Sequence, residues 1–169
     1  DYVWRPSQIP PLLESIYKQY PIGSILIWES TQPVPLKDAA IFQTKDPGRI
    51  PLVLLDGQQR LTSLAWVWKP EKRRDGKLID TRFNLETQKF KNPSKSDASN
   101  PLNVPVREVV GRDAELSNVL EKAGVRTDNG MYAVYLQRLT MLNNAFNNFQ
   151  VPVVTFPSDD YEVVADVFA

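Results

Sequence analysis

The segment PLVLLDGQQRLTS, residues 51–63, decides how the chain is interpreted. Residues 51–55 are apolar without alternation, which predicts a strand buried on both faces. Asp56 and Gly57 are typical of a turn, and the spacing that follows predicts a helix from Gln58 to Trp68. The inward face of that helix is expected to carry Leu61, Leu64, Ala65 and Trp68.

This strand–turn–helix arrangement suits an anion. Gly57 lets the backbone approach a ligand without a Cβ atom, and the helix start directs free N–H groups and its positive dipole end at the same place. Arg60 lies in the first turn, where a cation is unfavourable unless an anion offsets it. Gln58 and Gln59 add amide groups, and the next polar positions add hydroxyl groups, from Thr62 and Ser63.

The motif is not a Walker loop, because it has no Gly-Lys-Ser/Thr sequence. Asp56 has two candidate roles, as a ligand of Mg²⁺ or as a residue that orients water for phosphoanhydride hydrolysis. A purely structural alternative stays open. In that alternative Asp56 caps the helix, Gly57 only turns the chain, and Arg60 pairs with Asp56 or Glu29.

The rest of the chain predicts an α+β fold, in which a small sheet is flanked by helices and the C-terminal part is more helical. A helix capped by Ser7 is expected to bury one face and to end before Pro21, after which Gly23 permits a turn. The expected inward residues of that helix are Ile9, Leu12, Leu13, Ile16, Tyr17 and Tyr20. The other expected elements are strands at 24–29 and 151–156, a hairpin of 81–86 with 89–91, and helices at 113–122 and 131–149. The apolar stripe of the helix at 131–149 is expected to comprise Tyr132, Tyr135, Leu136, Leu139, Leu142 and Phe146. Ser158 is expected to cap a last helix, whose inward residues are Val163, Val164 and Val167.

Composition excludes several kinds of chemistry. The chain has no Cys and no His, which removes thiolate nucleophiles, Ser-His-Asp hydrolysis and His-based metal sites. The net charge of +0 argues against a protein that binds DNA through bulk positive charge. Its 169 residues fit one domain, divided into a sheet-containing core at 1–100 and a mainly helical portion at 101–169. No signal peptide or membrane-spanning apolar run is found, so we expect no membrane contact and a cytoplasmic location.

The segment PLVLLDGQQRLTSL resembles the signature of the GmrSD-type restriction endonuclease N-terminal domain family. The opening segment YVWRPSQIPPLLESIYKQYPIGSILIW and the closing segment YEVVADVFA are also similar to that family, so the resemblance covers nearly the whole chain. It implies a fold similar to ParB and sulfiredoxin. It also implies a nucleotide-dependent, modification-sensing restriction system that defends bacteria against phage.

In that family, the domain couples NTP binding and hydrolysis to a nuclease elsewhere in the protein. The resemblance assigns Asp56, Gln58 and Arg60 to catalysis. It places the nucleotide phosphates against Gly57, Gln58, Gln59, Arg60, Thr62, Ser63 and Arg5. It further implies Mg²⁺ held by Asp56, an NTP such as GTP, and DNA bound through the full-length protein; a homo-oligomer is kept open. A non-hydrolysing module that senses nucleotide or DNA is the alternative.

The chain departs from the family pattern in several ways. It starts too late to include a Gln-Arg pair expected before Tyr2, and an Asn/Gly-rich motif expected after Ala169 is missing. We therefore expect a fragment of a longer protein. Without His it is not an HNH nuclease, and without Cys it does not carry out the sulfiredoxin reaction.

Other candidate positions have simpler explanations. Arg5 is expected near the start of the first helix, where a solvated surface role is the alternative to phosphate contact. The basic run at 69–77 is most simply a solvated loop, and Gly23-Ser24 most simply a helix-to-strand turn. The strand position of Trp28 and the stripe position of Trp68 favour core packing, whereas Trp4 is the freest to stack on a base. The Asn-rich stretch at 143–148 is expected to be a solvated face or a frayed helix end.

Overall fold

The computed structural model describes residues 6–31, 52–68, 79–92, 94 and 99–168. The predictions for Trp4, Arg5, the connection 32–49 and the basic run 69–77 therefore lie outside the described residues. The helical elements are η1 Pro6–Gln8, α1 Ile9–Tyr17, α2 Gln58–Trp68, α3 Val106–Val109, α4 Leu116–Lys122, α5 Tyr132–Asn147 and α6 Tyr161–Phe168. The strands are β1 Ile25–Glu29, β2 Leu52–Asp56, β3 Arg82–Asn84, β4 Phe90–Lys91, β5 Asn103–Pro105 and β6 Val153–Pro157.

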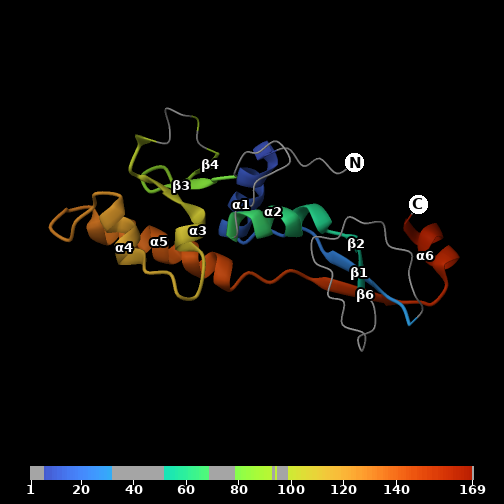
Figure 1. The fold of residues 1–169 in the computed structure, drawn as a ribbon. Coiled ribbons are helices and arrows are strands. Elements are labelled where there is room, and N and C mark those ends of the chain that lie inside the picture. The colour runs from blue at the N-terminus through green and yellow to red at the C-terminus, as the bar shows by residue number, and fades with distance from the viewer. Residues whose placement is uncertain (1–5, 32–51, 69–78, 93, 95–98, 169) are drawn as a thin grey trace. The chain divides into compact units, whose positions relative to one another are not determined.

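The chain forms two compact units, and both combine segments that are far apart in the sequence (Figure 1). Unit 1 consists of Asp1–Ile22 and Ser63–Gln150, and unit 2 consists of Gly23–Thr62 and Val151–Ala169. Helix α2 begins in unit 2 and ends in unit 1. The division into 1–100 and 101–169 follows neither unit, since each unit contains residues from both ranges.

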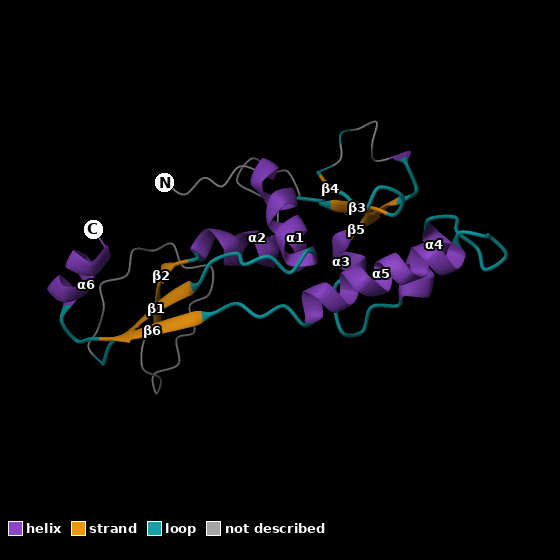
Figure 2. Cartoon of the chain, turned by 180° about the vertical axis from the view of Figure 1, so that it is seen from behind, coloured by secondary structure: helices purple, strands orange, loops and turns teal. Residues whose placement is uncertain are grey.

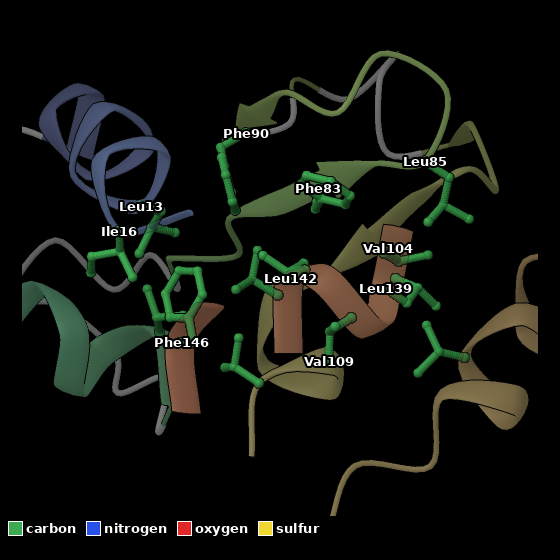
Figure 3. Packing of buried hydrophobic residues seen from close by; sticks show 14 of the residues in the cluster. Leu13, Ile16, Phe83, Leu85, Phe90, Val104, Val109, Leu139, Leu142 and Phe146 are labelled. Atoms are coloured by element: carbon green, nitrogen blue, oxygen red, sulfur yellow. The ribbon is translucent and has the colours of Figure 1, made fainter. Parts of the chain in front are cut away.

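Unit 1 contains a hydrophobic core built from helices and a small sheet (Figure 3). Helix α1 contributes a buried face with the spacing predicted for a helix: Ile9, Leu12, Leu13 and Ile16. Helix α5 contributes a second such face: Tyr135, Leu139, Leu142 and Phe146. Phe83 and Phe90 lie between these elements, with ring centroids 5.1 Å apart. The predicted apolar stripes of both helices are confirmed at these positions.

The sheet of unit 1 has the strand order β4-β3-β5. The predicted hairpin is confirmed, since β3 pairs antiparallel with β4 through Arg82↔Lys91 and Phe83↔Phe90. Strand β5 and helix α3 were not predicted from the sequence. They span Asn103–Pro105 and Val106–Val109, which is too short for a periodic pattern to be recognised.

Unit 2 contains a mixed sheet with the strand order β2-β1-β6 (Figure 2). Strand β1 pairs antiparallel with β2 and parallel with β6, with Ile25 opposite Val153. The prediction that residues 51–55 form a strand buried on both faces is wrong. Leu52 in β2 is 64% exposed and Val153 in β6 is 56% exposed, because both strands lie at the edges of a narrow sheet. Only the central strand buries large side chains, and Trp28 is buried as predicted.

Side-chain hydrogen bonds join the end of β1 to the connection between β6 and α6. Trp28 Nε1 donates to the carbonyl of Ser158 at 2.6 Å. Asp159 accepts from the backbone N–H and the hydroxyl of Thr31, each at 2.7 Å, and from Ser30 Oγ at 3.3 Å. These bonds connect segments that the sequence separates widely.

Several predicted caps and helix faces are wrong in detail. Ser7 lies inside η1 and Gln8 occupies the cap position of α1, while Tyr20 is 58% exposed because α1 ends at Tyr17. Helix α6 is capped by Asp160, whose Oδ1 accepts from the N–H groups of Glu162 and Val163; Ser158 Oγ instead accepts from the N–H of Asp160. In α6, Val164 is buried as predicted but Val163 is 44% exposed.

The inward face of α2 also differs from the prediction. Leu61 is 39% exposed and Trp68 is 42% exposed, whereas Thr62, Ser63 and Val67 are buried. The first residues of α2 belong to unit 2 and the rest belong to unit 1. A single apolar stripe along the whole helix therefore does not predict which of its side chains are buried. The ring of Trp68 still meets Phe146 edge-on, with centroids 6.1 Å apart.

The Asn-rich end of α5 is not simply solvated. Asn143 Nδ2 donates to the carbonyls of Val109 and Gly111 at 2.7 and 2.8 Å, and Asn147 Nδ2 donates to Asn143 Oδ1 at 2.9 Å. The Asn143 amide thus satisfies carbonyl groups at the end of α3 and just after it. Taken together, the described helices and strands form an α+β fold, with small three-stranded sheets flanked by helices. The similarity to ParB and sulfiredoxin stays a prediction, as does the single-domain assignment.

Candidate functional site

The turn between β2 and α2 has the predicted strand–turn–helix form. Strand β2 ends at Asp56, Gly57 adopts a φ of +95°, and α2 begins at Gln58. The N–H of Leu61 donates to the carbonyl of Gly57 at 3.0 Å, which makes Gly57 the N-cap residue. The helix geometry therefore leaves the N–H groups of residues 58–60 without acceptors inside the helix.

Gly57 is required for two reasons. Its positive φ lies in the region that favours glycine. In addition, a Cβ atom at this position would lie 2.3 Å from Cδ1 of Ile25, a buried residue of β1. The start of β1 therefore packs directly against the turn, and backbone approaches backbone there.

Asp56 organises the turn through both carboxylate oxygens. Its Oδ1 accepts the N–H of Gly57 at 2.6 Å, and its Oδ2 accepts Nη2 of Arg60 at 2.8 Å. The structural alternative, in which Arg60 pairs with Asp56, is thus present as a contact. The pair is uneven, since the Arg60 side chain is 16% exposed and that of Asp56 is 71% exposed. A largely exposed partner makes this ion pair weak, about 0–1 kcal/mol.

The other predicted residues of the site differ in accessibility. Gln58 and Gln59 are half-buried at the start of α2. Thr62 and Ser63 are 8% and 1% exposed, and Ser63 Oγ has no hydrogen-bond partner within the described part of the chain. Asp56, Gly57 and Arg60 are brought together by hydrogen bonds and close packing, whereas the roles of Gln58, Gln59, Thr62 and Ser63 stay predictions.

The packing of Gly23 against Arg60 is the contact of the site that the sequence did not predict. Gly23 was interpreted as a plain turn between α1 and β1, yet it lies beside the guanidinium of Arg60. The only signal in the sequence is a glycine just before an apolar strand, and that pattern does not reveal what the backbone contacts.

An open hollow of about 450 Å³ lies elsewhere, in unit 1, where α3 leads into α4. None of the predicted site residues lines it. Its charged side chains include two that are already paired, Arg107 with Asp80 and Lys122 with Glu108. The hollow therefore gives no support to the predicted chemistry.

The described residues contain no helix of sufficient length and apolarity to cross a membrane. They also contain no cluster of three or more His, Cys, Asp or Glu residues arranged to hold a metal ion.

Comparison with known proteins supports the family assignment made from the motif. No curated protein matches the chain. The family model described as "GmrSD restriction endonuclease, N-terminal domain" matches residues 1–169, which is the whole chain. The chain therefore belongs to the GmrSD restriction endonuclease N-terminal domain family.

Proposed function

We propose that the turn from Asp56 to Arg60 binds the phosphates of a nucleoside triphosphate, and that the full-length restriction protein hydrolyses this nucleotide. The observation that carries the proposal is the uneven Arg60–Asp56 pair. An arginine side chain that is 16% exposed is held at the start of a helix by an aspartate side chain that is 71% exposed.

Electrostatics explain why such a pair suits a phosphate. A cation in the first turn opposes the helix dipole, and Asp56 offsets that cost. Because the pair is weak, a phosphate with more than one negative charge competes with Asp56 for the guanidinium at little cost. The backbone N–H groups of residues 58–60 add donors at the same helix end.

The proposed roles follow from these positions. Arg60 and the backbone N–H groups at the start of α2 hold the phosphates, and the Gln58 side chain orients the terminal one. Asp56, once released from Arg60, orients the attacking water or ligates a metal ion. The sequence also assigns Thr62, Ser63 and Arg5 to the phosphates, although Arg5 lies outside the described residues.

These residues could hold Mg²⁺ only if oxygen atoms of the substrate phosphates supply the other ligands. Mg²⁺ is commonly bound through one or two carboxylates together with substrate phosphates. Asp56 supplies one exposed carboxylate, and its oxygens accept hydrogen bonds from Gly57 and Arg60, which leaves further lone pairs for a cation. Bound there, Mg²⁺ would neutralise charge on the phosphates.

The family assignment gives the proposed activity its context. The domain belongs to a restriction endonuclease family, and the chain contains no His for an HNH centre. Hydrolysis here would control cleavage of DNA by a nuclease domain elsewhere in the full-length protein. DNA, a nucleotide and a second copy of the chain are the proposed partners, in phage defence within the cytoplasm.

One observation favours a second candidate, a module that binds nucleotide or DNA phosphate without hydrolysing it. Both oxygens of Asp56 already accept hydrogen bonds from groups within the turn. If these bonds persist with ligand bound, Asp56 positions Arg60 and does not activate water.

The test uses the full-length protein with Mg-GTP and Mg-ATP, measuring equilibrium binding and phosphate release. We expect Arg60→Ala to weaken binding about 10- to 100-fold, the effect of losing a charged hydrogen bond of about 1.5–3 kcal/mol. We expect Asp56→Asn to abolish most phosphate release while retaining binding.

The matched control is Glu14→Gln, which removes another i,i+4 ion pair, that with Lys18 in α1. It should change neither quantity. Unchanged binding by Arg60→Ala would refute the site, and wild-type binding without phosphate release would favour the second candidate.

A further inference from the structure

Gly23 lies beside the guanidinium of Arg60 within unit 2. It belongs to the connection between α1 and β1 and has a φ of +86°. A Cβ atom added to Gly23 would lie 2.3 Å from Nη1 of Arg60, 3.4 Å from Cζ and 3.8 Å from Nη2. The end of the guanidinium therefore occupies the space that any other residue at position 23 would fill.

Gly124 and Gly111, which also have positive φ, do not share this property. Gly124, at the end of α4, has a φ of +72°, and an added Cβ atom would meet nothing within 4 Å. Gly111 likewise has open space around it. The positive φ of Gly124 is sufficient to explain glycine at that position. At position 23, the absence of a side chain also leaves room for the guanidinium of Arg60.

The same guanidinium approaches Gly57. A Cβ atom added at Gly57 would lie 3.5 Å from Nη2 of Arg60, on the side of the guanidinium that donates to Asp56. Two glycines, one before β1 and one after β2, therefore lie next to the end of the Arg60 side chain. Together with Asp56 they determine where its N–H groups point.

We infer that Gly23 is a positioning residue for Arg60, and that its missing side chain sets the orientation in which the guanidinium meets phosphate. Gly23 acts through Arg60 and needs no contact with the ligand. The functional part of this inference rests on the proposed nucleotide site, whereas the packing part does not.

A double-mutant cycle for stability tests the packing. Gly23→Ala and Gly124→Ala carry similar strain from positive φ, but only the first places a methyl group against Arg60. We expect Gly23→Ala to lower the urea midpoint less in an Arg60→Ala background than in wild type. The effect of Gly124→Ala should be equal in both backgrounds. Additive effects of Gly23→Ala and Arg60→Ala would overturn the inference.

The second measurement is Mg-GTP binding and turnover by the full-length protein. We expect Gly23→Ala to weaken binding by about tenfold, which corresponds to 1.4 kcal/mol, and Gly124→Ala to change it by less than about twofold. The double variant Gly23→Ala/Arg60→Ala should bind no more weakly than Arg60→Ala alone.

The outcomes separate the two ideas. If Arg60→Ala leaves binding unchanged, the proposed function fails, while the stability cycle still decides whether Gly23 positions Arg60. If Arg60→Ala weakens binding but Gly23→Ala behaves like Gly124→Ala, the site stands and the role of Gly23 is refuted.

Discussion

The two compact units are stabilised by different kinds of interaction. Within the described residues, the large hydrophobic cluster belongs entirely to unit 1, whereas unit 2 contributes only Ile25, Trp28 and Val164 to the buried hydrophobic side chains. Unit 2 relies instead on strand pairing and on polar bonds such as those to Asp159. A region with few buried apolar contacts opens locally at low cost, and the candidate site lies in that region.

The largest expected effect comes from cutting into the core of unit 1. Phe83 is 0% exposed, and its ring lies 5.4 Å from that of Tyr17. Phe83→Ala should lower the free energy of unfolding by about 3–5 kcal/mol, because it removes buried area and leaves a cavity. The measurement is urea denaturation followed by circular dichroism.

The control is Leu52→Ala in unit 2, where the side chain is 64% exposed. It should cost less than about 0.5 kcal/mol. Equal losses for the two variants would contradict the contrast between the units.

An intermediate effect is expected from the polar bonds of unit 2. Asp159→Ala removes the acceptor for Ser30 Oγ and for two donors of Thr31. The cost should be roughly 1–3 kcal/mol, confined to unit 2. Hydrogen exchange should speed up at the N–H groups of Thr31 and Ser158, while the core amides of unit 1 exchange as in wild type.

Asp128→Ala is the matched control for that variant. Asp128 is 79% exposed and lies 3.9 Å from Arg126, so its removal should leave exchange unchanged throughout. Faster exchange spread evenly over both units would show that they unfold together.

The smallest effect concerns a polar group at the margin of the unit 1 core. The Tyr17 hydroxyl donates to Oε1 of Gln88 at 2.9 Å, and burial raises the pKa of Tyr17 although nearby Arg138 partly lowers it. Because the pKa of Tyr17 is raised in the folded state, its contribution to the free energy of unfolding is fully present below the unfolded-state pKa of about 10. It is lost as pH rises above that value, because the unfolded chain releases its proton first.

Tyr17→Phe should therefore cost about 0.5–1.5 kcal/mol at pH 7 and flatten the fall in stability above pH 10. The measurement is the urea midpoint as a function of pH from 7 to 11. Tyr20→Phe, at a residue that is 58% exposed, is the control for loss of a tyrosine hydroxyl and should leave the urea midpoint at pH 7 unchanged. An unchanged slope in Tyr17→Phe would refute the assignment.

Local patterns in the sequence predicted those parts of the fold that depend on near neighbours. The helical spacing of Ile9, Leu12, Leu13 and Ile16 identified the buried face of α1, since one helix supplies that face. The turn at Asp56-Gly57 was also predictable, because glycine and aspartate have strong preferences there. The family that the motif indicated is the family whose model matches residues 1–169.

Patterns that depend on distant segments were not predictable. An apolar run such as β2 predicts a strand that is buried on both faces, but the burial of a strand depends on how many strands join the sheet. The parallel pairing of β1 with β6, and the approach of Gly23 to Arg60, join segments that no local pattern connects. These contacts carry much of the candidate site, so the motif alone did not identify all of its residues.

The pairing of β1 with β6 has a consequence for synthesis. Thr31 and Asp159, which tie the ends of those strands together, are 128 residues apart. At about 5–20 residues per second, a ribosome needs roughly 6–25 seconds to make the intervening chain. During that interval β1 and β2 emerge with one edge lacking its parallel partner, an arrangement open to pairing with other nascent strands. The motif that identifies the family is thus translated well before the strand that completes its sheet.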